Sequence, residues 1–273
     1  MKGKRVLYIS SEVIPYLPET PISSISYRAP SMVKKRGGQI RIFMPRFGNI
    51  NERRHQLHEV IRLSGMNLVV NDLDMPLIIK VASIPKDRIQ VYFIDNEEYF
   101  KRKATTTDEE GNLFSDNDER AIFFAKGVIE TVKKLNWNPD IIHVQGWMAS
   151  LVPMYLRNYY ANDPLFEESK IVTSVFETGY EGSLDADMAK KISYDDIDKD
   201  VLSVIDEPTY DNLMKLAMTH SDGVIQGSEN LSDELQKFFD GLDKPTLGYH
   251  NLDEFADPYE DFYLNKLGTA TEE

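Results

Sequence analysis

Apolar residues occur along this chain in two alternating patterns, short continuous runs and longer segments with helical spacing. The continuous runs have strand length and cover 5–13, 39–47, 139–145, 170–176 and 223–228. The first helical segment ends as SMVKKRGG, where basic residues precede glycine as at a helix C-terminus. This alternation predicts parallel βαβ units, and therefore an α/β fold with a doubly wound, mostly parallel, Rossmann-like sheet over nearly the whole chain.

Three further segments modify the alternation. Residues about 60–100 hold three short strand-like runs separated by turn residues, which predicts an inserted strand region. Acidic residues concentrate at about 183–208, which suggests an exposed insertion. They concentrate again at 251–273, which suggests a surface-lying or mobile acidic tail. We therefore expect one domain over 1–250, followed by that tail.

Composition is that of an ordinary globular protein. The 273 residues are 41% hydrophobic, enough for a sizeable core, and no apolar run approaches the roughly 20 residues that cross a bilayer. The start, MKGKRVLYIS, feeds directly into a strand without signal-peptide features, so the cytoplasm is the expected compartment. The absence of cysteine excludes disulfides and thiolate metal sites. We expect neither a metal nor a cofactor.

Charge restricts the partners. The net charge is -14, from 45 acidic and 31 basic residues. Nucleic acid and anionic membranes both attract a positive field, so neither is an expected partner.

Six segments, in this order, carry a family resemblance: VLYISSEVIP, KKRGGQIRIFMPRFGNIN, VYFIDNEEYFKR, FSDNDERAIFFAKG, PDIIHVQGWMASLVPMYLR and KLAMTHSDGVIQGSENLSDEL. They resemble the N-terminal catalytic domain of bacterial glycogen and starch synthases, the ADP-glucose-dependent glucosyltransferases. The resemblance implies the N-terminal half of a two-domain GT-B type glycosyltransferase, whose active site lies in the cleft between the domains. Nothing in the chain corresponds to the second domain, which would hold most of the nucleotide contacts.

The family's first loop carries a Lys-Thr-Gly-Gly-Leu motif that approaches the sugar nucleotide. Here the matching positions read Pro18, Glu19, Thr20, Pro21 and Ile22. The lysine and both glycines are lost, Glu19 would repel a diphosphate, and the prolines remove backbone N–H donors. Downstream, Arg28 is a candidate cation for a ligand; the alternative is a surface or packing arginine.

A second family motif, His-Asp-Trp-His, follows a strand, and its last histidine lies near the transferred glucose. This chain has Gln145, Gly146, Trp147 and Met148 there, and methionine neither donates nor accepts a proton. Trp147 and Met148 are interpreted as core residues between sheet and helix, with a sugar platform as the alternative. We expect His143, two residues earlier, to be a buried imidazole with satisfied hydrogen bonds.

A third family stretch, Thr-Ile-His-Asn-Leu-Ala-Tyr-Gln-Gly, reads SVFETGYEG here (174–182). Its histidine and asparagine have become Phe176 and Glu177, while Tyr180 is retained. Glu177 is a candidate base or sugar ligand at a strand's carboxyl end; the alternative is a solvated loop carboxylate.

One family site persists in Asp116, Asn117 and Arg120. The resemblance places the aspartate in the acceptor-side cleft, and Asp116 is the other candidate catalytic residue. An acidic residue immediately before a helix is also an ordinary N-cap, and the two roles are compatible.

Three functions stay open. The first is a stand-alone, non-catalytic relative that binds a glucan, another sugar ligand or a protein partner. The second is an active glucosyltransferase whose nucleotide half comes from another chain. The third is a structural or regulatory subunit without a sugar site. Aromatic side chains lining a cleft would favour sugar binding, and the candidates are Tyr16, Tyr27, Trp147 and Tyr180. A homodimer over the open cleft is also expected.

Overall fold

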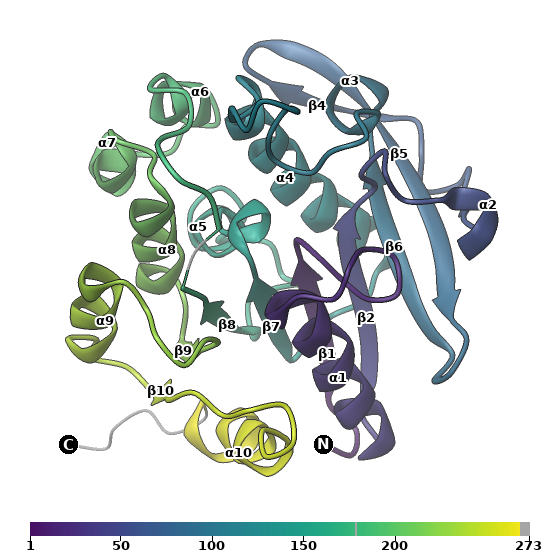
Figure 1. The fold of residues 1–273 in the computed structure, drawn as a ribbon, viewed down its shortest axis with the longest axis vertical. Coiled ribbons are helices and arrows are strands. Elements are labelled where there is room, and N and C mark those ends of the chain that lie inside the picture. Colours follow the sequence, from purple (N-terminus) through teal and green to yellow (C-terminus); the bar gives the residue numbers. More distant parts are fainter. Residues whose placement is uncertain (178, 268–273) are drawn as a thin grey trace.

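The computed structural model describes residues 1–177 and 179–267, and its centre is a twisted sheet (Figure 1). The strand order is β10-β9-β8-β7-β1-β2-β6-β5-β3, and β4 pairs with β5 beside this path. The strands from β10 to β6 in that order run parallel. Their bounds are β1 (Arg5–Ser10), β2 (Gln39–Pro45), β6 (Ile89–Asp95), β7 (Ile141–Gln145), β8 (Lys170–Val175), β9 (Gly223–Gln226) and β10 (Thr246–Leu247). The predicted doubly wound, mostly parallel α/β sheet is confirmed.

The region predicted as an inserted strand segment divides into two parts. Its last strand, β6, belongs to the parallel sheet, because Ile42 of β2 pairs with Val91 of β6. Only the preceding strands continue antiparallel from that edge: β3 (His58–Glu59), β4 (Met66–Val70) and β5 (Leu73–Ile84). Sequence spacing did not distinguish the two parts, since short apolar runs have the same pattern in parallel and antiparallel strands.

The crossover helices cover the two faces of the sheet unequally. From β1 to β2 the chain moves one way along the sheet, and from β7 to β10 it moves the other way. Because crossovers are right-handed, these two directions place their helices on opposite faces. The first face receives α1 (Pro21–Lys35). The second receives α4 (Asn117–Leu135), α5 (Val152–Arg157), α8 (Tyr210–Thr219) and α9 (Asp233–Asp240), which contact one another in that order.

The segment after β7 forms two short helical pieces in place of one continuous helix. A short turn, η1 (Trp147–Ala149), comes first, and α5 starts afresh at Val152 with Pro153 in its first turn. Proline lacks the N–H that would continue the earlier turn. Two single-turn helices, α2 (Glu52–His55) and α3 (Glu97–Phe100), lie in loops elsewhere. In the part of the chain that the structure describes, no helix has the length and apolarity to cross a membrane.

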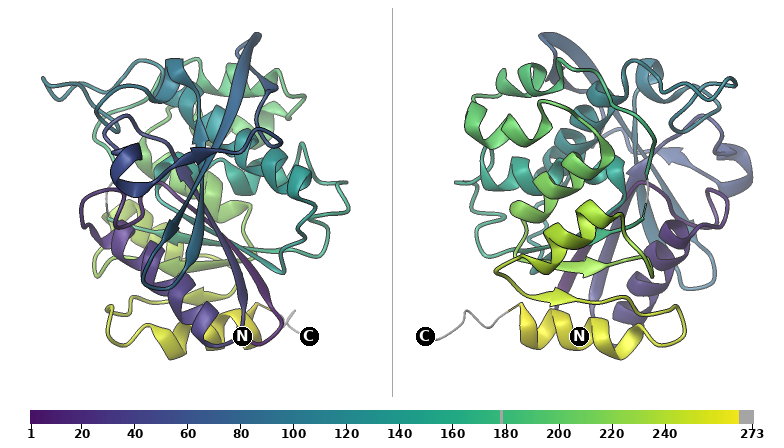
Figure 2. Two further views of the ribbon diagram at one scale, coloured as in Figure 1. Left: turned by 90° about the vertical axis from the view of Figure 1, so that its right-hand side faces the viewer. Right: turned by 60° about the vertical axis from the view of Figure 1, so that its left-hand side comes forward.

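The C-terminal segment forms a second helix on the α1 face of the sheet (Figure 2). It consists of α10 (Ala256–Asp261) and the π-helical turn η3 (Phe262–Lys266), and it buries the rings of Tyr259, Phe262 and Tyr263. Arg36 holds it by ion pairs to Asp257 and Glu260. Residues 255–267 thus lie on the surface of the domain and are anchored there, because buried aromatic residues alternate with the acids; 268–273 lie outside the described residues.

The acidic segment 183–208 is anchored as well as exposed. It forms α6 (Met188–Ser193), α7 (Lys199–Leu202) and the turn η2 (Ser203–Ile205). Its apolar side chains point inward and are buried, namely Leu184, Met188, Ile192, Ile197, Leu202 and Ile205. Most of its carboxylates lie outside, so this insertion packs against the domain through one apolar side.

Candidate functional site

The candidate site lies at the carboxyl edge of the parallel strands. The sheet reverses its direction of growth between β1 and β7, and the crevice at such a reversal is where ligands bind in this class of sheet. The loops after β1, β7 and β8 and the start of α4 all lie at this edge. They carry most of the residues singled out in the sequence.

The first loop closes the N-terminus of α1 with its own side chains. Thr20 is the N-cap: its Oγ1 accepts the Ser23 N–H at 3.0 Å, and the Ser23 Oγ accepts the Thr20 N–H at 2.8 Å. Two carboxylates flank this capping box. Thr20 donates its hydroxyl to Glu12 at 2.6 Å, and Ser24 donates to Glu19 at 3.2 Å. The N-terminus of a helix normally favours an anion. Here the capping box already provides hydrogen-bond partners at this end of α1, and two carboxylates lie beside it.

Behind this loop, polar side chains fill the crevice between β1 and β7. Ser26 of α1 donates to the Gln145 Oε1 at 2.8 Å, and the hydroxyls of Ser10 and Ser26 lie 2.7 Å apart. All three residues are buried. The Gln145 Nε2 has no hydrogen-bond partner within the described part of the chain. The crevice is therefore occupied by residues of the domain itself.

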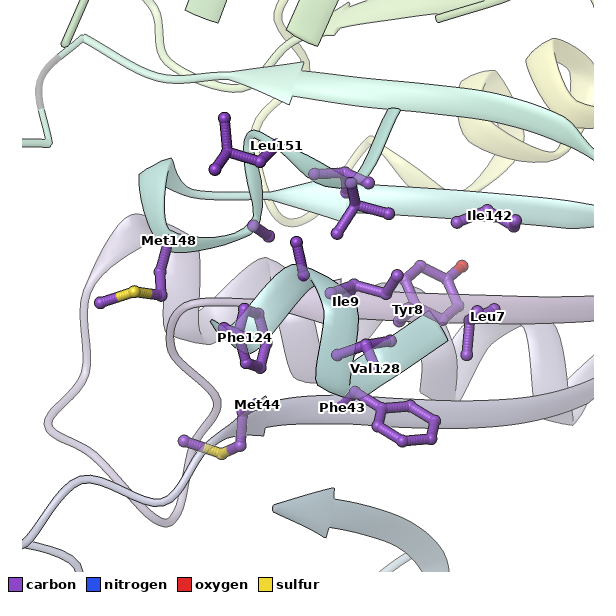
Figure 3. Close-up of a cluster of buried hydrophobic side chains, with 14 of the residues drawn as sticks. Leu7, Tyr8, Ile9, Phe43, Met44, Phe124, Val128, Ile142, Met148 and Leu151 are labelled. Carbon is purple, nitrogen blue, oxygen red and sulfur yellow. The ribbon is translucent and has the colours of Figure 1, made fainter. Parts of the chain in front are cut away.

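The second motif is part of the core. Met148 is fully buried, and Figure 3 shows it in the same cluster of hydrophobic side chains as Phe124 and Leu151. Trp147 is 5% exposed and meets Tyr180 edge-to-face, with ring centroids 5.3 Å apart. The interpretation of Trp147 and Met148 as core residues is confirmed. An open sugar platform on Trp147 would need an exposed ring face, which this packing does not leave.

His143 is the satisfied buried imidazole that the sequence predicts. Its Nδ1 lies 2.6 Å from the Tyr263 hydroxyl, and its Nε2 lies 2.7 Å from the Ser174 hydroxyl. Burial lowers the pKa of His143 to about 3, which keeps the ring neutral. The helix that supplies Tyr263 comes from the C-terminal segment, so this imidazole stabilises the packing of that segment.

The remaining candidates do not gather around one cavity. Glu177 is exposed just beyond the end of β8. Tyr16 is buried against Phe93, with ring centroids 4.8 Å apart, and the hydroxyl of Tyr180 donates to the Pro208 carbonyl at 2.8 Å. Roles for these residues in binding stay predictions.

Two cavities flank α1. One of about 530 Å³ is lined by Glu19, Tyr27 and Arg28. Tyr27 donates to Asp87 at 2.6 Å, and Arg28 donates to the Leu252 carbonyl at 3.0 Å, so both side chains have internal partners. The other cavity, of about 340 Å³, lies where the start of α1 meets the segment 249–252; its lining includes Glu19, Thr20, Ser24, Tyr249 and His250.

At α4, Asp116 occupies the predicted position immediately before the helix, but its side chain does not cap it. The structure shows no cap hydrogen bond from Asp116 within the described residues; its Oδ2 instead accepts from the Arg102 guanidinium at 2.5 Å. Arg102 also lies over the Phe114 ring, 4.2 Å from its centroid. Asp116 is therefore the N-cap residue by position, as the sequence predicts, but a charged partner from the preceding loop takes its carboxylate in place of a cap hydrogen bond.

Asn117 and Arg120 fasten that loop to α4. Arg120 is fully buried and donates to the Asn117 Oδ1 at 2.6 Å and to the Thr105 carbonyl at 2.8 Å. Burial lowers the pKa of Arg120 to about 9. Its Nε and Nη2, like the Asp116 Oδ1, lack hydrogen-bond partners in the region that the structure covers. This is a buried charged cluster with unused donors and acceptors.

A second buried charge cluster joins α4 to α6. The Lys191 ammonium lies 2.7 Å from Asp118, 3.0 Å from Glu119 and 3.0 Å from Asp185. Burial raises the pKa of Asp118 to about 6 despite this cation.

Sequence reasoning missed Glu12, Arg102 and Lys191, because each acts through a partner distant in sequence. Among residues 1–177 and 179–267, no cluster of metal-ligating side chains occurs.

Comparisons with known proteins agree with this architecture. The starch synthase catalytic domain family matches residues 5–247. Glycogen synthases of Chlorobium phaeobacteroides and Chlorobium limicola are each 34% identical, over 245 and 232 residues, or 89% and 85% of this chain. The matches cover 49% and 47% of those proteins, so the chain spans about half the length of the curated relatives it matches.

A solved structure shows the same fold. The catalytic domain of starch synthase IV from Arabidopsis thaliana, bound to ADP and acarbose, superposes with a TM-score of 0.74 at 18% identity. The match covers 92% of this chain and 52% of that one.

Proposed function

Given that the chain belongs to the starch and glycogen synthase family, we propose that this domain binds an α-glucan and does not by itself transfer glucose. One observation carries the non-catalytic half of the proposal: the N-terminus of α1 is closed by the Thr20–Ser23 capping box, and the carboxylates of Glu12 and Glu19 flank it. A glycosyl transfer that releases a nucleoside diphosphate needs cations or free N–H groups at such a place.

The second motif supports the same conclusion. The position of the histidine that lies near glucose in the family is Met148, which is fully buried in apolar surroundings. Phe176, at the position of another family histidine, is also buried, 2% exposed. Packed apolar side chains at these two positions stabilise the domain, but they cannot make the polar contacts that catalysis would need. Removal of a single preorganised electrostatic contact typically lowers turnover by roughly 10²–10³.

Glucan binding is supported by the cavity of about 340 Å³ beside the start of α1. It combines the Tyr249 ring, 40% exposed, with the polar side chains of Glu19, Thr20 and His250. Sugars bind through C–H faces on aromatic rings and through hydroxyls on polar groups, and this cavity offers both.

The test is a turnover assay paired with a binding assay. Purified protein with ADP-glucose or UDP-glucose and glycogen should release no nucleoside diphosphate above a no-enzyme control, and Asp116→Ala should change nothing. Calorimetry with maltoheptaose should show binding. Turnover of about one per second that disappears in Asp116→Ala would overturn the non-catalytic proposal. No heat of binding would overturn the glucan proposal.

A second candidate function is a glucosyltransferase completed by another chain. The charged cluster at α4 favours it, because the Asp116–Arg102 pair and the unpartnered N–H groups of Arg120 remain at a site that the family uses for the acceptor. Adding the separately expressed C-terminal half of the Chlorobium limicola glycogen synthase should then produce diphosphate release that depends on Asp116. Absence of release in the mixture would exclude this candidate.

We also propose that a second copy of the chain covers the open cleft at the carboxyl edge of the sheet. Light scattering at micromolar concentration should report a dimer, with an interface on the order of 1,000 Å² or more. A clean monomer would contradict this part of the proposal.

A further inference from the structure

A groove with two half-exposed tyrosines lies on the α4–α5 side of the sheet, opposite α1. Its volume is about 470 Å³, within the range of small-molecule sites. β4, α4, the turn after α5 and the turn after α6 contribute its walls. Tyr159 is 51% exposed and Tyr194 is 52% exposed, and Val69 adds an exposed apolar side chain. Most large apolar side chains of this domain are buried, which makes this concentration at one groove unusual.

The floor of the groove is a fixed polar network. Lys126 donates to the Asp195 carboxylate at 2.5 Å and to the Val69 carbonyl at 2.8 Å. Tyr155 donates to the other oxygen of Asp195 at 2.8 Å. The Lys126 and Asp195 side chains are only 6% and 12% exposed. Four segments distant in sequence are thereby held at defined positions around the groove.

The Tyr159 ring is fixed in orientation. It contacts Tyr160 edge-to-face with centroids 4.7 Å apart, and Tyr155 at 6.5 Å. The Lys126 ammonium lies 5.7 Å from its centroid. A preoriented aromatic face that remains half exposed binds a flat apolar surface with little loss of side-chain entropy.

The charges in the groove nearly cancel. Lys126 neutralises Asp195, and Glu130 pairs with Lys133 at 3.2 Å and accepts a hydrogen bond from Tyr160. Asp196 remains as an exposed carboxylate, and the exposed Asn67 amide also lines the groove. The Asp196 carboxylate would repel an anionic ligand. A cationic ligand would find no other carboxylate without a cationic partner among the described residues that line the groove. A neutral polyhydroxylated ligand would use the rings for its C–H face and Asp196 and Asn67 for its hydroxyls.

We propose that this groove is a carbohydrate-binding site for a neutral oligosaccharide, which stacks on Tyr159 and Tyr194. It is separate from the cavity beside α1, because α1 and the α4–α5 layer lie on opposite faces of the sheet. The assignment of the sugar as an α-glucan rests on the proposed function. Of the residues that line the groove, Lys126 alone lies in a segment that carries the family resemblance.

Maltoheptaose is titrated into the full chain and into single variants. Binding is measured by calorimetry and by the NMR chemical shifts of isotope-labelled tyrosine. Tyr159→Ala and Tyr194→Ala should each weaken binding at the groove about tenfold, a loss of roughly 1.4 kcal/mol. Tyr249→Ala, in the cavity beside α1, should leave the groove titration in place. Leu264→Ala, which truncates another exposed apolar side chain at 39% exposure, should leave all binding unchanged.

The outcomes separate the two proposals. Binding that is lost in Tyr159→Ala or Tyr194→Ala but kept in Tyr249→Ala supports the groove. Binding that is lost only in Tyr249→Ala overturns the groove and keeps the proposed function. No binding to wild type overturns both. Thermal melting of each variant shows whether it is folded, and a variant with a lowered melting temperature is replaced by Tyr159→Leu or Tyr194→Leu, which keep apolar bulk without a ring.

Discussion

The starts of α1 and α4 lie at the same edge of the sheet and differ in how their polar groups are satisfied. At α1, Thr20 and Ser23 cap each other and the first turn of the helix. At α4, Asp116 leaves the helix uncapped within the described residues and pairs with Arg102. The first helix start is closed to an anionic ligand, whereas the second retains buried charged atoms that have no partners among the described residues.

This difference concerns how each helix start meets the hydrogen-bonding needs of its polar groups. A capping box stabilises a helix and consumes the N–H groups that an anion would use. Buried polar atoms without partners cost free energy, so their persistence at α4 is expected only where a ligand, a water or a partner satisfies them. The two helix starts therefore differ in what they could offer a ligand: the first has its own cap, and the second keeps buried polar atoms without partners among the described residues.

The largest expected effect is at Arg120. Arg120→Ala removes a fully buried guanidinium, two hydrogen bonds to Asn117 and Thr105, and its packing on three rings. We expect a loss of about 3–5 kcal/mol in the free energy of unfolding, measured by urea denaturation. Arg102→Ala, whose side chain is 31% exposed, is the control and should cost about 1 kcal/mol. Equal losses would mean that burial of Arg120 does not matter.

The second prediction concerns pH. Burial raises the pKa of Asp118 from 3.8 to about 6. The folded state therefore binds this proton more tightly than the unfolded state, which stabilises the fold fully below about pH 4. This contribution is lost as the pH rises through about 6. The stability of the wild type relative to Asp118→Asn should fall over that interval, by an amount on the order of 3 kcal/mol. A relative stability that rises with pH would indicate a lowered pKa instead.

The capping comparison predicts a smaller effect. Thr20→Ala removes the hydroxyl that accepts the Ser23 N–H in the capping box. This change should cost about 1 kcal/mol of unfolding free energy. Asp116→Ala loses only a partly exposed ion pair and should cost less. Chemical denaturation of both variants checks the order, and the reverse order would show that Asp116 carries the greater structural role.

The smallest expected effect is at Glu12. Glu12→Gln keeps an acceptor for the Thr20 hydroxyl while removing a negative charge near the α1 N-terminus. We expect a loss of about 0.3–1 kcal/mol at low ionic strength, which should diminish in high salt. Thermal melting at two salt concentrations measures it. A loss independent of salt would assign the effect to the hydrogen bond alone.

Local patterns in the sequence determined much of the fold. Strand-length apolar runs and helix endings predicted the parallel sheet, the position of Asp116 before a helix and the burial of His143, because each depends on neighbours within a few residues. The first-loop substitutions Pro18, Glu19 and Pro21 were visible in the same way. What they form locally, a capping box around Thr20 and Ser23, was not anticipated.

Only the tertiary structure decided which distant groups meet. It paired β6 with β2, seated the C-terminal Tyr263 against His143, and joined Asp116 to Arg102 and Asp118 to Lys191. It also placed Tyr159 and Tyr194 at one groove. Periodicity shows which side of a strand or helix is buried, but it does not show which other element covers that side. Those choices follow from the topology of the sheet and from side-chain packing between segments far apart in the chain.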